Sequence, residues 1–338
     1  MNKDTILEVK NVSKRFTSKG VTVKAVTDVS FNVGKGETIG IVGESGCGKT
    51  TLGRCIVRAH EASEGEVWYR TESGEELDFL KVDKKKMKEI RKEIQMIFQD
   101  PYSSLDPRMT VLDIIKEPLQ ANYPKMPKAE MDALAKQMAE KVGLNPAYLM
   151  RYPHAFSGGQ RQRIGIARAL VVKPQLIVCD EAVSALDVSI QAQVINLLRD
   201  LQKEMNLTYL FISHDLSVVE HISDKVGVMY LGRLVEFAPT EDMFKKPMHP
   251  YTEALLSAVP VADPTIKRER IPLMGEIPNP ANPPSGCYFH ERCRYCTQKC
   301  VDEAPELKTM PDGRLCACHR AEELSLGGFD YEVQGTEA

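Results

Sequence analysis

Hydrophobic and polar positions divide most of the chain into short apolar runs and longer helical patterns. Residues 6–12 and 23–33 combine alternating or continuous apolar positions with β-branched side chains, which predicts two strands of an antiparallel lobe. Further apolar runs, typical of buried strands, lie at 37–43, 94–98, 175–180 and 207–215. Helical patterns lie at 50–59, 111–121, 128–144, 160–172 and 190–205. Strands that alternate with helices predict an α/β fold, in which a mostly parallel sheet is covered on both faces.

The composition changes after about residue 257. Residues 278–285 are proline-rich and predict an extended segment, and six of the nine cysteines follow it, between Cys287 and Cys318. We therefore predict four parts: a main domain at 1–257, a helical subdomain within it at about 101–165, a small cysteine-rich C-terminal extension at 258–325, and a flexible tail at 326–338.

Composition and charge exclude several classes of protein. Hydrophobic residues make up 43% and charged residues 27% of the 338 residues, as in folded globular chains. The net charge of −3 argues against a nucleic-acid partner, and the basic run at 81–92, which has no interleaved aromatic residues, is interpreted as a solvated helix face. No stretch approaches the ~18 consecutive apolar residues of a membrane helix, and the N-terminus does not resemble a signal peptide. The chain is therefore expected in the cytosol, where another polypeptide would span any membrane at which it works.

A glycine-rich loop at 43–50 carries the most specific chemistry. Its sequence, GESGCGKT, fits G-x-x-x-x-G-K-[ST] and lies between a predicted strand and a predicted helix, so a chance glycine-rich turn is disfavoured. The glycines let backbone N–H groups point at phosphate oxygens, and the helix N-terminus adds a favourable dipole. Lys49 supplies positive charge to the β- and γ-phosphates of ATP, and the Thr50 hydroxyl can bind Mg²⁺. The residues expected to contact the nucleotide here are Gly43, Ser45, Gly46, Cys47, Gly48, Lys49, Thr50 and Thr51.

Two adjacent carboxylates end the apolar run at 175–180. Asp180 is expected to hold Mg²⁺, and Glu181 is placed to polarise the attacking water. Adjacent acids at a strand end can also be plain turn residues, but a phosphate-binding loop in the same chain favours the catalytic interpretation.

The segment FSGGQRQR at 156–163 resembles the signature motif of ABC ATPases. Ser157 is expected to cap a helix, and Gly158, Gly159 and Gln160 to approach a γ-phosphate through backbone N–H groups. A Ser-Gly-Gly turn that only caps a helix is the alternative. The resemblance implies a head-to-tail pair of cassettes, in which each signature motif closes on the ATP of the other.

The same resemblance assigns roles to four more residues. Gln99 matches the glutamine that senses Mg²⁺ and water, and His214 matches the histidine that contacts the γ-phosphate. Asp187, in the sequence SALD, matches a dimer-facing loop, and Phe16 falls where the family stacks an aromatic ring on adenine. Ala182 departs from the proline that usually follows the catalytic glutamate, and we expect activity to survive this change because both carboxylates remain.

Residues from roughly 5 to 320 closely resemble ATP-binding subunits of dipeptide/oligopeptide permeases. The resemblance rests on segments such as QMIFQDPYSSLDPRMTVLDIIKEPL, HPYTEALLSAVP and GEIPNPANPPSGCYFHERC. It implies a P-loop NTPase of ABC type with a RecA-like sheet, bound to the cytoplasmic face of the membrane. The implied partners are a homologous or identical ATPase subunit, two integral-membrane permease subunits and an extracytoplasmic substrate-binding protein. The alternatives are importers of nickel or oligosaccharides, and a soluble ABC ATPase that acts on DNA or ribosomes.

The six clustered cysteines predict a metal centre. Dense thiols in a reducing compartment indicate zinc or an iron–sulfur cluster, with unmetallated thiols as the remaining alternative. The permease family carries four recurring tail cysteines, which match Cys287, Cys293, Cys300 and Cys318 and resemble ligands of a [4Fe–4S] cluster. Cys296, Cys316 and His319 are additional and can change the ligand set.

Overall fold

The structure is a computed structural model that describes residues 1–100, 102–260 and 270–328. Most of the predicted tail, from residue 329 onward, therefore lies outside the described residues. An eight-stranded sheet lies at the centre of the molecule, in the order β11-β12-β10-β9-β3-β8-β7-β6. Its parallel strands are β3 (Thr38–Val42), β6 (Ile94–Ile97), β7 (Leu176–Asp180), β8 (Thr208–Ile212) and β9 (Lys225–Tyr230). The predicted mostly parallel sheet is confirmed.

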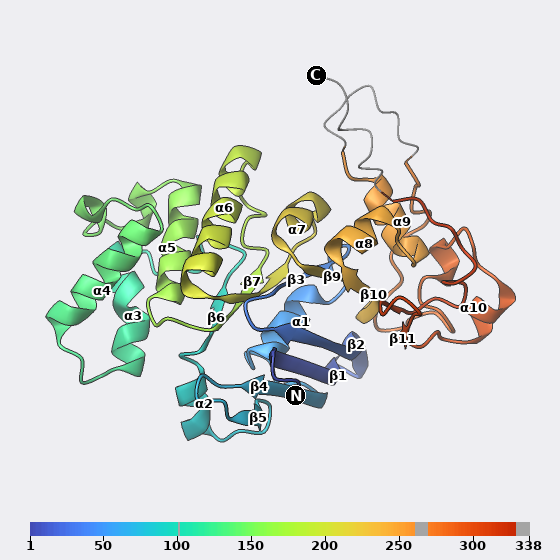
Figure 1. Ribbon diagram of the computed structural model, residues 1–338, viewed down its shortest axis with the longest axis horizontal. Helices are drawn as coiled ribbons and strands as arrows, with labels where there is room; N and C mark the ends of the chain where they lie inside the picture. The colour runs from blue at the N-terminus through green and yellow to red at the C-terminus, as the bar shows by residue number, and fades with distance from the viewer. Residues whose placement is uncertain (101, 261–269, 329–338) are drawn as a thin grey trace.

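A second, antiparallel sheet forms the N-terminal lobe. It consists of β1 (Thr5–Ser18), β2 (Val21–Gly34), β4 (Glu64–Arg70) and β5 (Glu76–Asp78), in the order β2-β1-β4-β5. The two predicted strands are present and longer than expected, because they continue into a hairpin beyond the apolar positions. In Figure 1 this lobe lies below the central sheet.

Helix α1 (Lys49–Ile56) packs between the two sheets. Helices α5 (Gly158–Leu170), α6 (Val188–Met205), α7 (Leu216–Ile222) and α8 (Thr240–Lys245) contribute to the core on the opposite face of the central sheet, whereas α2 (Lys84–Ile90) belongs to the core shared with α1 and the N-terminal lobe. Successive residues of β7 show why both faces are buried. Leu176 and Val178 belong to the core shared with α1 and the N-terminal lobe, whereas Ile177 and Cys179 belong to the core shared with the helices. A strand with two apolar faces needs cover on both sides, as the sequence pattern predicted.

The helical subdomain lies at one end of the molecule. It contains α3 (Val111–Asn122), α4 (Lys128–Lys141) and α5 (Gly158–Leu170), and α6 (Val188–Met205) packs beside α5. The C-terminal extension lies at the opposite end (Figure 1). Further helices of the main domain are α2 (Lys84–Ile90), α7 (Leu216–Ile222), α8 (Thr240–Lys245) and α9 (Pro250–Ser257). No helix in the described part of the chain is both long and apolar enough to cross a membrane.

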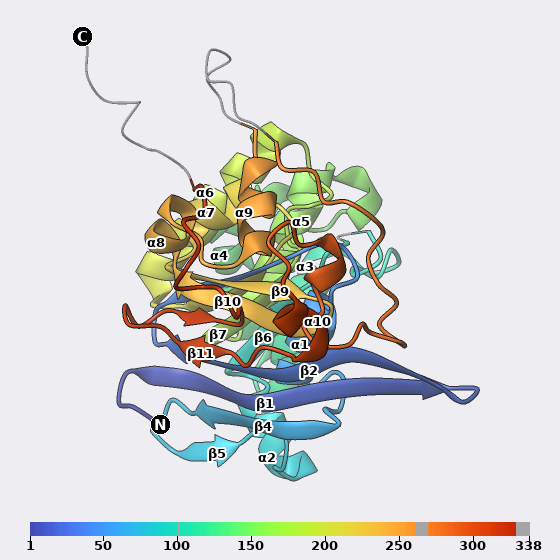
Figure 2. The same cartoon turned by 90° about the vertical axis from the view of Figure 1, so that its right-hand side faces the viewer.

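The C-terminal extension adds strands to the central sheet. Strand β12 (Leu315–Cys316) pairs with β10 (Arg233–Pro239), and β11 (Lys308–Thr309) pairs with β12. A short helix, α10 (Gln298–Asp302), lies among the cysteines, and Figure 2 shows the extension across the edge of the sheet above β1 and β2. The extension is therefore fixed to the main domain by backbone hydrogen bonds.

Candidate nucleotide-binding and hydrolysis site

The loop between β3 and α1 has backbone geometry that requires glycine. Gly43, Gly46 and Gly48 have φ values of 150°, 80° and 105°. A Cβ atom at Gly43 would lie 2.2 Å from the carbonyl oxygen of Met229, and one at Gly48 would lie 2.1 Å from that of Ala25. The loop is therefore pressed against its neighbours at two points, and its curvature depends on the absence of side chains there.

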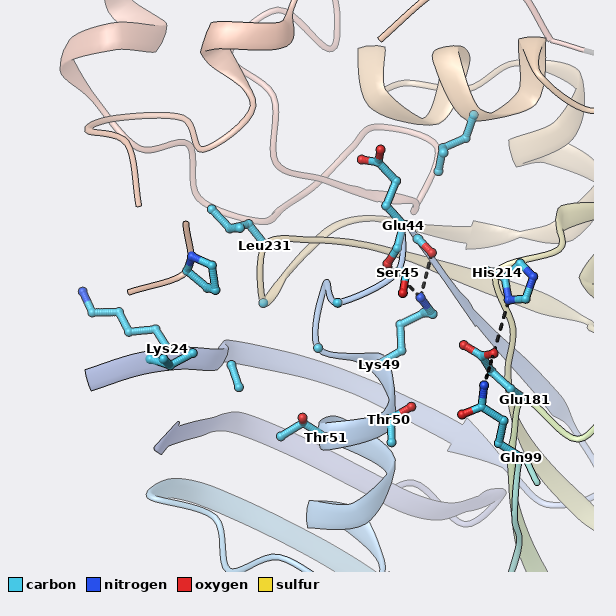
Figure 3. A pocket seen from close by; sticks show the side chains of 18 of the residues that line it. Lys24, Glu44, Ser45, Lys49, Thr50, Thr51, Gln99, Glu181, His214 and Leu231 are labelled. Carbon is cyan, nitrogen blue, oxygen red and sulfur yellow. Dashed lines mark hydrogen bonds and ion pairs between the residues drawn. The ribbon is translucent and has the colours of Figure 1, made fainter. Parts of the chain in front are cut away.

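Lys49 lies inside this loop with only 3% of its surface exposed. Its Nζ atom donates hydrogen bonds to the carbonyl oxygens of Gly43, at 2.7 Å, and Glu44, at 3.0 Å. The ammonium group is held by backbone oxygens at the pocket, where it can meet the phosphates of a nucleotide. Figure 3 shows Lys49 directed at the loop, with Thr50 and Thr51 following it on α1.

Thr50 and Asp180 form the oxygen-rich part of the site. The Thr50 hydroxyl donates a hydrogen bond of 2.7 Å to Oδ1 of Asp180, which is almost fully buried at the end of β7. Burial raises the pKa of Asp180, and the Thr50 hydrogen bond and Arg54 oppose that shift. A hydroxyl and one carboxylate, completed by phosphate oxygens, are the donors that Mg²⁺ uses in nucleotide sites, so these residues fit the ion.

Three side chains from three separate segments meet at the other end of the pocket (Figure 3). Gln99 Nε2 donates a hydrogen bond of 2.9 Å to Oε2 of Glu181, and Nδ1 of His214 lies 3.3 Å from the same oxygen. Glu181 has a φ of 48°, a left-handed conformation that costs a non-glycine residue about 1–3 kcal/mol. The strained backbone turns its carboxylate toward the pocket, where it can accept a proton from water.

One pocket contains these groups except Asp180, which is buried behind the lining and bonded to Thr50. It is lined by Val23, Lys24, Ala25, Gly43, Glu44, Ser45, Gly46, Gly48, Lys49, Thr50, Thr51, Gln99, Glu181, His214, Leu216, Leu231, Gly232, Leu255 and Pro280. Cys47 belongs to the same loop but is buried beside Lys49. Phe16 pairs with Val23 across the β1–β2 hairpin, and its ring packs edge-on against His60. The expected adenine-stacking residue thus lies next to the pocket wall and outside its lining.

The signature motif lies outside this pocket. Ser157 caps α5 through a capping box with Gln160, so that the backbone N–H groups of Gly158 and Gly159 lie at a helix N-terminus. Asp187 caps α6 in a similar way, by accepting a hydrogen bond from the backbone N–H of Ile190. The nucleotide pocket therefore uses none of these five positions from its own chain.

Comparison with known proteins identifies the family. Residues 26–184 match the family model described as ABC transporter, and residues 235–300 match the model described as oligopeptide/dipeptide transporter, C-terminal region. The oligopeptide transport ATP-binding protein AppF of Bacillus subtilis is 52% identical, over 94% of this chain and 98% of its own length. The dipeptide transport ATP-binding protein DppF of Haemophilus influenzae is 51% identical, over 91% and 92%. The chain belongs to the ABC transporter ATP-binding family.

The solved structures agree with this assignment. A dimeric ATP-binding cassette, MJ0796, determined in a post-hydrolysis state with ADP and phosphate, superposes with a TM-score of 0.62 and 27% identity. The match covers 70% of this chain and 99% of that cassette. The ABC cassette fold predicted from the sequence is thus confirmed, and the protein is an ABC ATPase whose ATP hydrolysis is coupled to transport.

In this ABC cassette four of the six clustered cysteines line one small pocket. They are Cys287, Cys293, Cys300 and Cys318, the four selected from the resemblance, and His319 lies at the same pocket. Cys296 is exposed and Cys316 is buried in β12, both outside its lining. Among the residues that the structure describes, no group of three or more His, Cys, Asp or Glu side chains is arranged to hold a metal ion.

The chemistry of these thiols suits a soft metal. Burial raises the pKa of Cys287 to about 12 and that of Cys293 to about 11, and the neighbouring thiols add to both shifts. Thiols that are buried together resist ionisation until a cation compensates their charge. The backbone N–H of Cys287 donates a hydrogen bond to the carbonyl oxygen of Cys300, which holds these two residues side by side. The four thiols are ligands of the type that zinc and iron–sulfur clusters use, although the described side chains are not arranged around a metal ion.

Sequence reasoning missed three contacts of the nucleotide pocket, two with the extension and one with α9 of the main domain. Arg292 forms an ion pair with Glu44, and the carbonyl oxygen of Pro280 accepts a hydrogen bond from the backbone N–H of Lys24. The hydroxyl of Tyr251, in α9, accepts one from the backbone N–H of Glu44. No local motif marks these residues, because their partners are more than 200 positions away in the chain.

Proposed function

We propose that this ABC cassette is the ATP-hydrolysing subunit of an importer of dipeptides or oligopeptides. The match of the extension to the oligopeptide/dipeptide transporter C-terminal region carries the proposal, since that region is additional to the ATPase core. Relatives that match over nearly their whole length are named as oligopeptide or dipeptide transport ATP-binding proteins. The substrate assignment comes from these relatives, because the nucleotide-binding residues identify ATP and carry no information on the transported molecule.

Each residue at the pocket has a proposed role in hydrolysis. Lys49 and the loop N–H groups bind the β- and γ-phosphates, and Thr50, Asp180 and Gln99 hold Mg²⁺, which supplies charge neutralisation at the phosphates. Glu181 accepts the proton of the attacking water, while His214 orients that water against the γ-phosphate. The contacts of Gln99 and His214 with one oxygen of Glu181 support this assignment, since all three groups converge where the phosphate would end.

A second cassette completes the site. Ser157, Gly158, Gly159 and Gln160 would meet the γ-phosphate held by the partner cassette, with Asp187 beside the interface and Phe16 against the adenine. The N-terminal position of these glycines on α5 supports the proposal, because free N–H groups at a helix N-terminus attract anions. The partner is a homologous cassette or a second copy of this chain.

The dimer would act on membrane partners. We place it at the cytoplasmic face of the membrane, bound to two integral-membrane permease subunits, with a substrate-binding protein on the other side. Gln99 and the helical subdomain after it would transmit closure of the dimer to the permease. The four pocket cysteines would hold a [4Fe–4S] cluster, with zinc as the alternative, and that metal would stabilise the proline-rich extension. Iron assay and visible absorption of anaerobically purified protein distinguish these two metals.

Uptake in cells tests the function. A strain that lacks this gene and needs one amino acid should grow on that amino acid but fail on di- and tripeptides that contain it. Wild-type protein should restore growth on peptides, and so should Asp200→Asn, which changes an exposed acid on α6. Glu181→Gln should not restore it. If peptide uptake is normal in the deletion strain while nickel or oligosaccharide uptake is lost, a sister importer is the correct assignment.

A further inference from the structure

The C-terminal extension forms an ion pair with the phosphate-binding loop. Nη1 of Arg292 lies 2.7 Å from Oε2 of Glu44, and Nη2 lies 3.1 Å from Oε1, so that both carboxylate oxygens are bound. The Arg292 side chain is only 5% exposed, and the Glu44 side chain is 24% exposed. A two-point contact of this kind fixes the direction of the carboxylate as well as its distance.

Aromatic side chains hold Arg292 and Glu44 in place. Nη1 of Arg292 donates to the hydroxyl of Tyr230 at 3.4 Å, and the ring of Phe289 packs against both Tyr230 and Tyr251. The Tyr251 hydroxyl accepts a hydrogen bond of 2.9 Å from the backbone N–H of Glu44. The carboxylate of Glu44 is therefore bound by Arg292 of the extension and its backbone N–H by Tyr251 of α9, while Tyr230 of β9 supports Arg292.

The charge of Glu44 makes this contact relevant to ATP. Glu44 lines the nucleotide pocket, and its carbonyl oxygen accepts a hydrogen bond from Lys49. An uncompensated carboxylate on a phosphate-binding loop repels the triphosphate, and a partly buried site screens that repulsion only weakly. The guanidinium group of Arg292 cancels this charge, and it does so from outside the ATPase core.

We propose that Arg292 is a positioning residue of the nucleotide site, which neutralises Glu44 and thereby sets the affinity for ATP. The extension makes a second contact at the same pocket through Pro280, which lines the pocket. The carbonyl oxygen of Pro280 accepts a hydrogen bond from the backbone N–H of Lys24. The proposal rests on the proposed ATPase function and extends it, because the extension becomes part of the nucleotide site.

Nucleotide affinity tests the proposal with three variants of the full chain, purified anaerobically. Arg292→Met should raise the Kd for a fluorescent ATP analogue, and the KM for MgATP, by about tenfold, with kcat within about twofold of wild type. Adding Glu44→Gln to Arg292→Met should restore the Kd to within about threefold, because the repelling charge is gone. Arg294→Met is the matched control: this arginine pairs with Glu253 on α9, and its loss should leave ATP affinity unchanged.

Two results would overturn the proposal. One is wild-type affinity in Arg292→Met, and the other is a double variant that binds ATP as weakly as Arg292→Met alone, which would indicate a purely structural role. A fall in kcat with unchanged KM would also oppose it, since inactive molecules lower kcat without changing the affinity of the rest. Failure of the wild-type protein to bind ATP would instead contradict the proposed function.

Discussion

Gln99 donates a hydrogen bond of 2.9 Å to Glu181, although 82 residues separate the two positions in the chain. Gln99 follows β6 and Glu181 follows β7, and these two strands are parallel neighbours in the sheet. Since parallel strands end at the same edge, the two side chains meet without any local motif that joins them. Through this contact Gln99, which precedes the helical subdomain, is hydrogen-bonded to Glu181, the proposed general base.

The first prediction concerns that base. Glu181→Gln should retain ATP binding and lower ATP turnover by about 10²–10⁴-fold, since an amide cannot accept the proton of the attacking water. The variant should also accumulate as a closed dimer with ATP, which size-exclusion chromatography measures. Asp200→Asn, an exposed acid-to-amide change, should hydrolyse ATP at the wild-type rate. Undiminished turnover in Glu181→Gln would refute the assigned role.

The second prediction concerns the Mg²⁺ site. Thr50→Val keeps the shape of the side chain but removes the hydroxyl that donates to Asp180 at 2.7 Å. The Mg²⁺ concentration needed for half-maximal ATPase activity should rise about tenfold or more, because both a ligand and the partner of the buried carboxylate are lost. Thr50→Ser keeps the hydroxyl and should need nearly the wild-type Mg²⁺ concentration. An unchanged Mg²⁺ titration in Thr50→Val would exclude Thr50 from the site.

The third prediction compares two glycines. Gly48→Ala should abolish nucleotide binding, because its φ is 105° and the new Cβ would lie 2.1 Å from the carbonyl oxygen of Ala25. Gly165→Ala, inside α5, meets no atom within 4 Å and should raise the free energy of unfolding by about 0.5–1 kcal/mol. Nucleotide titration and urea denaturation measure the two effects. ATP binding by Gly48→Ala at wild-type affinity would contradict the steric argument.

Much of the core architecture could be predicted, because the strands and the phosphate-binding loop are each marked by residues within one short segment of the sequence. Each predicted strand of the central sheet has a continuous apolar run, and the loop at 43–50 has glycines at the positions where the structure needs positive φ. Glu181 could be proposed because it directly follows such a strand, whereas His214, two residues beyond another, was assigned from the family resemblance.

The contacts of the extension could not be predicted in this way. Arg292 and Glu44 are 248 positions apart, and neither lies in an apolar pattern that fixes its partner. The extension is placed beside the loop by the pairing of β12 with β10. Strand β12 has only two residues, too few to show a recognisable alternation of apolar and polar positions. The selection of four cysteines from six likewise came from a family resemblance, since the spacing alone does not separate Cys296 and Cys316 from the rest.

The fourth prediction concerns pH. His249 is buried, and burial lowers its pKa to about 3, while its Nδ1 accepts a hydrogen bond from the backbone N–H of Tyr251. Between pH 6.5 and 3 the unfolded chain binds a proton at His249 that the folded chain does not, so folding stability falls as pH falls. This effect should cost about 1.4 kcal/mol between pH 7.5 and 5.5.

His249→Asn isolates this contribution, because asparagine keeps an acceptor for the Tyr251 N–H but does not titrate. The free energy of unfolding of the variant, from urea denaturation, should change less between pH 7.5 and 5.5 than that of wild type. Glu236, whose pKa burial raises to about 7, has the opposite pH dependence and is present in both proteins. Equal pH dependence in the two proteins would contradict a neutral, buried His249.

The last prediction concerns the metal. Cys293 lines the pocket of four thiols and directly follows Arg292, so loss of a metal ligand at this position should release the contact with Glu44. Cys293→Ser should lose iron or zinc, become more sensitive to protease between 270 and 328, and bind ATP more weakly than wild type. Cys296→Ser, which changes an exposed cysteine outside the pocket, should keep the metal, the protease resistance and the affinity for ATP.

If Cys293→Ser retains the metal, the protease resistance and the affinity while Cys296→Ser loses the metal, the four-cysteine ligand set is wrong. Loss of metal with unchanged ATP affinity would show that Arg292 stays on Glu44 without it.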